Sequence, residues 1–306
     1  MAFTAKDVQA LREKTGCGMM DCKKALTEAD GNMDKAVEVL REKGLATAAK
    51  KSGRIAAEGV VTTYVDAANN IGAIVEVNCE TDFVAKNPDF IALANKVAKT
   101  VVEKKPADVD ALNAEIIADG NVTVADAVQE LFLSVRENMK IRRFELVEGV
   151  VSTYIHAGGA TGVMVAFDTD LAANDGFAVY GKDIAMQIAA ANPSYLNEGA
   201  VPAEVVEKEK EILLAQIAND PKMASKPEQV IAKMVEGKIK KYYKENCLVN
   251  QEFIKDGDLA IAAYTEKTAK ELGGKIEIKG FVRFERGEGI EKKSDDFANE
   301  VASMVK

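Results

Sequence analysis

An internal repeat constrains the fold of this sequence more than any other feature. Residues 58–75 (EGVVTTYVDAANNIGAIV) match residues 148–165 (EGVVSTYIHAGGATGVMV) at 9 of 18 positions. Each copy contains two runs rich in β-branched residues around a polar turn, which is the pattern of a β-hairpin. A second match ends each copy, RFELVEG at 143–149 and RFERGEG at 283–289. We therefore expect two related units, each a hairpin followed by helices and a returning strand.

The second unit contains an insertion, because residues 148–289 make it 50 residues longer than the first unit at 58–149. Between residues 201 and 246, apolar residues recur at helical spacing in two runs, which the turn NDPKMASKPEQ separates. Ser225 and Glu228 in that turn have the spacing of a capping box. We expect two antiparallel helices that project as an arm, which serves either association or simple elaboration of the core.

The first 45 residues predict a bundle of three short helices. Asn32 is placed to cap the third helix and Gly44 to end it. A bundle this small has little core, so Met19 and Met20 compete for burial. An exposed methionine beside Lys23 would suit a partner-binding surface, because methionine adapts to partner shapes. Burial of both methionines is an equally good interpretation from the residues alone.

The whole chain is expected to be an α+β protein with five parts. In chain order these are an N-terminal three-helix domain with its linker at 1–55, a core subdomain at 56–147, a second core subdomain at 148–198 and 248–286, a helical hairpin arm at 199–247, and a C-terminal helical module at 287–306. The C-terminal module carries Phe297, Val301 and Met304 on one side of an amphipathic helix. Such a stripe would need a partner if it were exposed.

Composition leaves little room for catalytic or metal chemistry. His156 is the only histidine, so a site with several histidine ligands is impossible, and the four cysteines form no CxxC pair. The sequence has no GxxxxGK[ST] phosphate loop, and AGGATG at 157–162 is better interpreted as a hairpin turn. Carboxylates are plentiful, but no pair stands out. We expect no enzyme activity, no metal and no cofactor, with a carboxylate-based enzyme kept as an alternative.

The net charge of −9 makes the chain a poor candidate for wrapping nucleic acid, because such binding depends on neutralising phosphates with Lys and Arg. Basic stretches such as AAKKSGR are more often a solvated helix face, yet they keep an RNA- or ribosome-associated scaffold as an alternative function. No apolar run approaches the roughly 20 residues of a membrane helix. A charged helix start follows Met1 almost at once. We expect a cytoplasmic chain with no membrane contact.

Four segments resemble the elongation factor Ts family of bacterial translation factors. They are LREKTGCGMMDCKKALTEADGNMDKAVEVLREKG at 11–44, VNCETDFVAKN at 77–87, AKMVEGKIKKYY at 232–243 and GFVRFERGEGIEK at 280–292. The resemblance covers nearly the whole chain in the expected order. It implies a guanine nucleotide exchange factor for elongation factor Tu. It also implies an N-terminal ubiquitin-associated-like domain, a duplicated sheet-plus-helix core, an inserted antiparallel coiled-coil arm and a C-terminal module.

The resemblance assigns roles to one short segment, Thr81, Asp82, Phe83 and Val84. In the family, this TDFV element is a wedge that displaces the partner's magnesium. Phe83 would insert between partner helices beside the magnesium site, and Asp82 would help displace the groups that hold the ion. The residues alone favour a buried Phe83 with Asp82 capping the next helix, and the resemblance reverses that preference. The second repeat carries Leu171 in the corresponding place, where a packing role is expected.

The resemblance implies further partner contacts. Met19, Met20 and Lys23 are similar to the family's surface for the partner's nucleotide-binding domain. His156, in the second hairpin turn, is similar to a family histidine that faces another partner domain, although a lone histidine in a turn is more often simply solvated. The partner would be elongation factor Tu in its nucleotide-free or GDP-bound form. The chain itself would bind no nucleotide, and its arm is a candidate homodimer contact.

Overall fold

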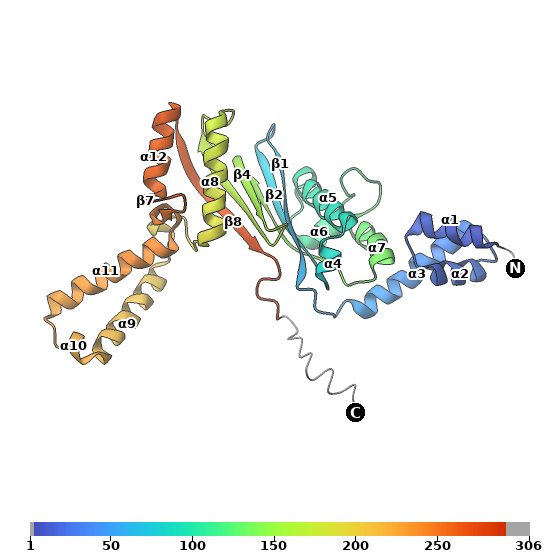
Figure 1. The fold of residues 1–306 in the computed structure, drawn as a ribbon, viewed down its shortest axis with the longest axis horizontal. Coiled ribbons are helices and arrows are strands. Elements are labelled where there is room, and N and C mark those ends of the chain that lie inside the picture. The colour runs from blue at the N-terminus through green and yellow to red at the C-terminus, as the bar shows by residue number, and fades with distance from the viewer. Residues whose placement is uncertain (1–2, 292–306) are drawn as a thin grey trace.

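The computed structural model describes residues 3–291 (Figure 1). Three helices begin the chain, α1 (Ala5–Thr15), α2 (Met19–Glu28) and α3 (Met33–Lys51). Asn32 caps α3, as predicted, by accepting a hydrogen bond from the Lys35 backbone N–H. The prediction that Gly44 ends α3 is wrong, because the helix continues to Lys51. A Cβ at Gly44 would lie 2.1 Å from Leu133 Cδ2, so glycine is needed there for a close approach of two helices.

The first unit begins with a hairpin and ends with a returning strand, as the repeat predicts. Its elements are β1 (Glu58–Asp66), β2 (Ile71–Cys79), α4 (Asp82–Ala85), α5 (Pro88–Lys104), α6 (Val109–Ala114), α7 (Val124–Val135) and β3 (Lys140–Glu148). The three strands form an antiparallel sheet in the order β1-β2-β3, so β2 is the central strand.

The second unit repeats this order around its insertion. Its elements are β4 (Val150–His156), β5 (Thr161–Thr169), α8 (Asp175–Ala191), β6 (Glu252–Phe253), β7 (Asp256–Ala260), α12 (Ile261–Leu272) and β8 (Ile276–Glu285). The sheet order is β4-β5-β8, and β6 and β7 form a small separate pair. Each central strand has an irregularity at the same repeat position, after Glu76 in β2 and after Ala166 in β5. The two central strands therefore correspond at an offset of 90 residues.

The two sheets pack against each other at the centre of the molecule. Val61, Ile74, Met164 and Phe284 are buried together between them. Figure 1 shows α5, α6 and α7 on one side of the strands and α8 and α12 on the other. β2 is buried at all nine of its positions, because helices cover one face and the second sheet covers the other. Its nearly continuous apolar run is what a strand buried on both faces requires.

The insertion forms the arm. It consists of α9 (Ala203–Asn219), α10 (Pro221–Ala224) and α11 (Glu228–Asn246), flanked by the 3₁₀ helices η1 (Glu198–Ala200) and η2 (Leu248–Asn250). Figure 1 shows α9 and α11 projecting from the core. The predicted capping box is wrong, because Pro227 is the N-cap of α11 and no side chain caps it. Ser225 instead ends α10, where its hydroxyl donates to the Lys222 carbonyl.

Helices and small antiparallel sheets together make an α+β fold, as predicted. None of the helices within residues 3–291 is long and apolar enough to cross a membrane. The predicted apolar stripe of Phe297, Val301 and Met304 lies outside the described residues.

Candidate functional site

The segment that follows β2 forms a tight turn with one side facing solvent. Thr81 caps α4 by accepting a hydrogen bond from the Val84 backbone N–H. Because α4 is a single turn, burial of Val84 and Ala85 directs the preceding side chains outward. Phe83 is 83% exposed, more than any other large hydrophobic side chain within residues 3–291. The interpretation from the residues alone, a buried Phe83 with Asp82 as the cap, is wrong on both points.

Residues that precede β3 hold this turn in place. Glu137 accepts two hydrogen bonds from Thr81, one from the backbone N–H at 2.9 Å and one from the hydroxyl at 2.7 Å. The Asn138 backbone N–H donates to Glu80 Oε1 at 2.6 Å, and the other Glu80 oxygen lies 3.3 Å from Arg54 Nη1. Both residues that precede α4, Glu80 and Thr81, are therefore held by contacts with other parts of the chain.

Asp82 places a negative charge beside the exposed ring. Its carboxylate accepts a hydrogen bond from Lys86 Nζ at 2.6 Å. That bond lowers the pKa of Asp82, and the charge of Arg286 lowers it further. A carboxylate with a lowered pKa is ionised at neutral pH. The turn thus presents an apolar ring, which can enter a crevice between helices, together with an anion, which can compete for a cation's ligands.

The end of β5 is built differently. The Thr169 hydroxyl donates to the Lys275 carbonyl at 2.6 Å and accepts from the Leu171 N–H at 3.0 Å. Asp170 accepts from the Lys275 backbone N–H at 2.7 Å. Leu171 packs against the second core, as predicted, and a Cβ added to Gly274 would lie 2.6 Å from its side chain. This turn therefore packs its apolar side chain, half-buried, against the protein.

Leu171 does not occupy the place of Phe83, so the correspondence of the two TD motifs is wrong. The offset of 90 residues between β2 and β5 puts Leu171 opposite Thr81. Residues 80–87 connect β2 to α5, whereas residues 170–174 connect β5 to α8. The first connection is three residues longer, and α4 forms within it.

The turn beside His156 lies at the same end of the first sheet as the TDFV segment. His156 ends β4 and is exposed, and its Nδ1 lies 3.0 Å from the Tyr154 hydroxyl. AGGATG contains a hairpin turn, as predicted, with the turn at 157–160 and its last two residues in β5. This turn contacts β1, because the Val61 N–H donates to the Gly159 carbonyl at 2.8 Å. The first residues of β1 pair with the last residues of β2, which lead into the TDFV segment.

Arg286 connects these two turns, although the sequence did not single it out. Its backbone N–H donates to the Ala160 carbonyl at 2.9 Å. Its guanidinium donates to the Gly59 carbonyl and lies 3.0 Å from a Glu58 oxygen. Its charge also contributes to the lowered pKa of Asp82. The sequence did contain a signal for this residue. In the repeated segments RFELVEG and RFERGEG, the first has a leucine where the second has Arg286.

Glu76 is a buried carboxylate that sequence reasoning also missed. It accepts hydrogen bonds from Arg142 at 3.0 Å, Arg143 at 2.7 Å and the Gly287 N–H at 2.8 Å. Burial raises the pKa of Glu76, but these bonds outweigh burial and the net pKa is lowered. The carboxylate joins the segment after β8 to the first sheet. Elsewhere too within residues 3–291, no group of three or more His, Cys, Asp or Glu side chains could hold a metal ion.

The N-terminal helices are attached to the same region. Met19 and Met20 begin α2 and are 44% and 62% exposed, so the interpretation that buries both is wrong. Lys23, one turn further on, is also exposed. Asp21 lies between them and pairs with Arg136 at 2.8 Å. Arg136 belongs to the loop before β3, which also holds the turn after β2.

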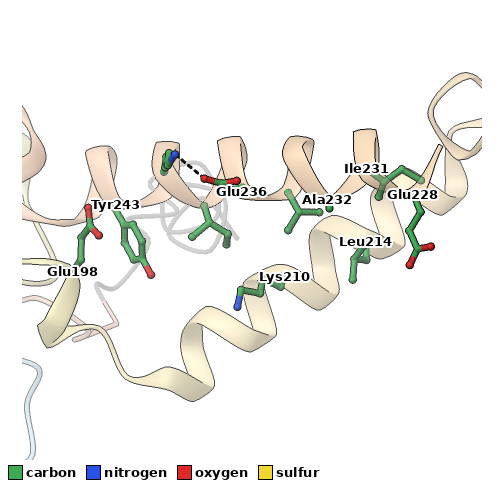
Figure 2. A pocket seen from close by; sticks show the side chains of 11 residues that line it. Glu198, Lys210, Leu214, Glu228, Ile231, Ala232, Glu236 and Tyr243 are labelled. Atoms are coloured by element: carbon green, nitrogen blue, oxygen red, sulfur yellow. Dashed lines mark ion pairs between the residues drawn. The ribbon is translucent and has the colours of Figure 1, made fainter. Parts of the chain in front are cut away.

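A groove of about 550 Å³ lies between the two long helices of the arm. Figure 2 shows Leu214 of α9 facing Ile231 of α11 across it. The lining residues are Glu198, Lys210, Leu214, Glu228, Ile231, Ala232, Val235, Glu236, Ile239, Lys240 and Tyr243. Glu236 and Lys240 form an ion pair at 2.7 Å. An apolar floor with charged edges is a composition found at association surfaces.

Comparison with known proteins identifies close relatives. A family model described as elongation factor TS matches residues 80–288. A protein named elongation factor Ts from Clostridium perfringens (strain 13 / Type A) is 54% identical over 305 residues, covering 99% of this chain and 99% of the relative. Proteins of the same name from Clostridium novyi (strain NT) and Clostridium botulinum (strain ATCC 19397 / Type A) are each 51% identical, covering 99% of this chain and 98% of the relative.

Proposed function

The chain belongs to the elongation factor Ts family, and we propose that its exposed turn at residues 81–84 releases GDP from elongation factor Tu. Members of this family are guanine nucleotide exchange factors for elongation factor Tu, and the chain has that role in translation elongation. Exchange changes which state of a GTPase is bound and breaks no covalent bond. The comparisons give no support to the alternative of an RNA-associated scaffold.

Exchange follows from thermodynamic linkage. A factor that binds the nucleotide-free partner better than the GDP-bound partner weakens GDP binding by the same factor. Each tenfold loss of GDP affinity requires about 1.4 kcal/mol of this differential binding. The factor itself needs no contact with the nucleotide, and GTP can bind once GDP has left.

The exposure of Phe83 carries the proposal. Its ring lies in solvent, while Thr81 and Glu137 fix the backbone beside it. Little conformational entropy would therefore be lost when the ring enters a partner. Burial between two partner helices would contribute about 2–3 kcal/mol. If that contact forms only with the nucleotide-free state, GDP affinity falls by about 30- to 150-fold.

Asp82 would act beside the ring. In GTPases a magnesium ion bridges the nucleotide phosphates and protein side chains. The ionised carboxylate would compete with the partner groups that hold this ion, while Thr81 and Val84 keep the turn in shape. The other proposed contacts are Met19, Met20 and Lys23 toward the partner's nucleotide-binding domain, and His156 toward another partner domain.

Family membership also supports a division of the chain. We assign a ubiquitin-associated-like domain to 1–55, core subdomains to 56–147 and to 148–198 with 248–286, the coiled-coil arm to 199–247 and the C-terminal module to 287–306. The groove of the arm would be a homodimer contact in the cytoplasm. Leu214→Lys should then abolish any concentration-dependent dimer in sedimentation velocity, and a dimer unaffected by this variant would contradict that assignment.

Stopped-flow release of fluorescent GDP from elongation factor Tu tests the function. The wild-type chain should accelerate release, and Phe83→Ala should lower the stimulated rate by about 30- to 150-fold. Ile116→Ala is a matched control, because Ile116 is also an exposed apolar residue of the first unit but lies outside the turn. Release that the wild-type chain does not accelerate would contradict the function. A fully active Phe83→Ala variant would remove only the turn from the mechanism.

A further inference from the structure

One loop contacts three separate parts of the molecule. Residues 136–138 belong to the loop 136–139, which joins α7 to β3. The contacts are Arg136 with Asp21 of α2 at 2.8 Å, Glu137 with Thr81 of the turn, and Asn138 with Glu80 and with the Ser52 and Arg54 carbonyls of the linker. The exposed methionine surface and the exposed ring are therefore attached to the same three residues.

Glu137 makes the most directed of these contacts. One carboxylate oxygen accepts the Thr81 N–H and the other accepts the Thr81 hydroxyl, at 2.9 and 2.7 Å. Hydrogen bonds to an ionised acceptor are shorter and stronger than neutral ones, and two bonds to one residue also fix its orientation. The same Thr81 hydroxyl oxygen accepts from the Val84 N–H and so caps α4. The contact with Glu137 and the cap of α4 therefore share the Thr81 hydroxyl.

The second repeat lacks this arrangement. The residue that corresponds to Thr81 at the 90-residue offset is Leu171, which has no hydroxyl. The nearby hydroxyl of Thr169 donates to the backbone carbonyl of Lys275. A carbonyl there accepts from the hydroxyl only, whereas the Glu137 carboxylate accepts from both the hydroxyl and the backbone of Thr81. That turn also packs its apolar side chain, Leu171, half-buried against the core. The pair of hydrogen bonds to a carboxylate is thus present in the turn that exposes an aromatic ring, Phe83.

We propose that Glu137 is a positioning residue for nucleotide exchange. By fixing Thr81 it orients α4, so that the ring of Phe83 is already in its binding direction before the partner arrives. Without Glu137 the cap of α4 remains but its orientation is not fixed, and the ring must be ordered during binding, which lowers the rate. The proposal rests on the proposed role of Phe83 in exchange.

A fluorescence experiment tests the positioning without the partner. The sequence contains no tryptophan, so Phe83→Trp introduces a single probe at the exposed position. Time-resolved anisotropy should show at least a twofold larger nanosecond motion of this probe when Glu137→Ala is added. Thr81→Val, which removes the hydroxyl bond to Glu137 together with the cap of α4 and keeps the backbone bond, should also increase this motion. Asp126→Ala is the matched control, because Asp126 accepts from the Thr123 hydroxyl at the cap of α7 and does not contact the turn. Unchanged motion in both test variants would overturn the proposal.

A double-mutant cycle measures the consequence for exchange. Glu137→Ala should lower stimulated GDP release about tenfold when Phe83 is present and less than twofold in the Phe83→Ala background. Glu137→Gln, whose single acceptor oxygen can keep one of the two bonds, should restore part of the rate. Equal losses in both backgrounds would show a general effect on the fold and overturn the proposal. If Phe83→Ala alone leaves release unchanged, the proposed role of the ring fails, while the anisotropy result still decides whether Glu137 orients the turn.

Discussion

The ends of β2 and β5 are equivalent places in two similar units, yet they present different chemistry. After β2, residues 80–87 form α4 and expose Phe83. After β5, residues 170–174 pack Leu171 against the core. Three additional residues allow one helical turn, which buries one side and exposes the other. The repeated frame positions both turns, and the length of the connection determines which one can act as a contact.

The largest effect on stability should come from substitution of Glu76 inside β2. The corresponding residue of β5 is Ala166, which has no charge. Glu76→Ala leaves Arg142 and Arg143 without their shared carboxylate. Breaking a buried ion pair costs about 3–5 kcal/mol. Because both arginines are partly exposed, we expect a loss near 3 kcal/mol in the free energy of unfolding, measured by urea denaturation.

Glu288→Ala is the control for this variant, because Glu288 is an exposed partner of Arg143. Surface ion pairs contribute about 1 kcal/mol or less, so its cost should be clearly smaller. If Glu76→Ala and Glu288→Ala lowered the free energy of unfolding by similar amounts, burial of the Glu76 carboxylate would not be the source of its stabilising effect on the first unit.

Separate substitution of the two turns should separate exchange from stability. Phe83→Ala should slow GDP release by about 30- to 150-fold and leave the melting temperature nearly unchanged, because the ring lies in solvent. Leu171→Ala should lower the free energy of unfolding by about 2 kcal/mol, because it removes a packed side chain, and should leave release at 25 °C nearly unchanged. For each variant, stopped-flow release of GDP measures exchange, and thermal denaturation measures stability. Slower release in a fully stable Leu171→Ala variant would contradict the division of roles.

Acid should weaken the first unit through Glu76, and Ala166 offers no such group in the second. The pKa of Glu76 is lowered from its ordinary value of 4.5, so the unfolded chain takes up the proton first. Its stabilisation is complete above that value and is lost as pH falls through the lowered pKa. Each unit of lowering corresponds to about 1.4 kcal/mol. Urea denaturation from about pH 6 to about pH 3 should show a steeper decline for the wild-type chain than for Glu76→Gln, and parallel curves would contradict this assignment.

Sequence patterns predicted the elements that are set locally. Alternation in the repeat located both hairpins and both returning strands, and helical spacing located the arm. Errors arose where tertiary contacts override a local signal. Gly44 resembles a stop signal, yet it lies inside α3 because Leu133 packs on it. Glu76 could not be recognised as part of a buried cluster, because one of its partners, Gly287, lies 211 positions away.

The TDFV motif located the candidate site, but it did not predict the geometry. The similar sequences TDF and TDL suggested that Leu171 corresponds to Phe83. The offset between the two repeats, however, is not the same for the strands as for the helices that follow them. The two hairpins correspond at 90 residues, whereas the helix caps Asn87 and Asn174 are 87 apart. That difference was readable as a three-residue insertion in the first unit. The two hydrogen bonds between Glu137 and Thr81 could not be predicted from the sequence, because the two residues are 56 positions apart.

The smallest effect on GDP release should come from the Asp82 carboxylate beside the Phe83 ring. The turn after β5 has no large exposed apolar side chain for a carboxylate to accompany. Asp82→Ala removes an exposed carboxylate whose main partner is Lys86, so stability should change little. Stimulated GDP release should fall by roughly 3- to 10-fold, as expected for one charge interaction in a partly hydrated interface. Asp82→Asn, which keeps the shape and removes the charge, should behave like Asp82→Ala.

Magnesium dependence shows whether this charge acts on the partner's ion. If Asp82 competes for the groups that hold magnesium, its removal should matter at millimolar magnesium and lose its effect in EDTA, where the ion is already gone. Lys86→Ala keeps the carboxylate and should retain most of the wild-type rate in both conditions. An Asp82→Ala variant that slows release equally with and without magnesium would mean that the carboxylate contributes to docking alone. The chemistry that distinguishes the two turns would then be reduced to the exposed ring.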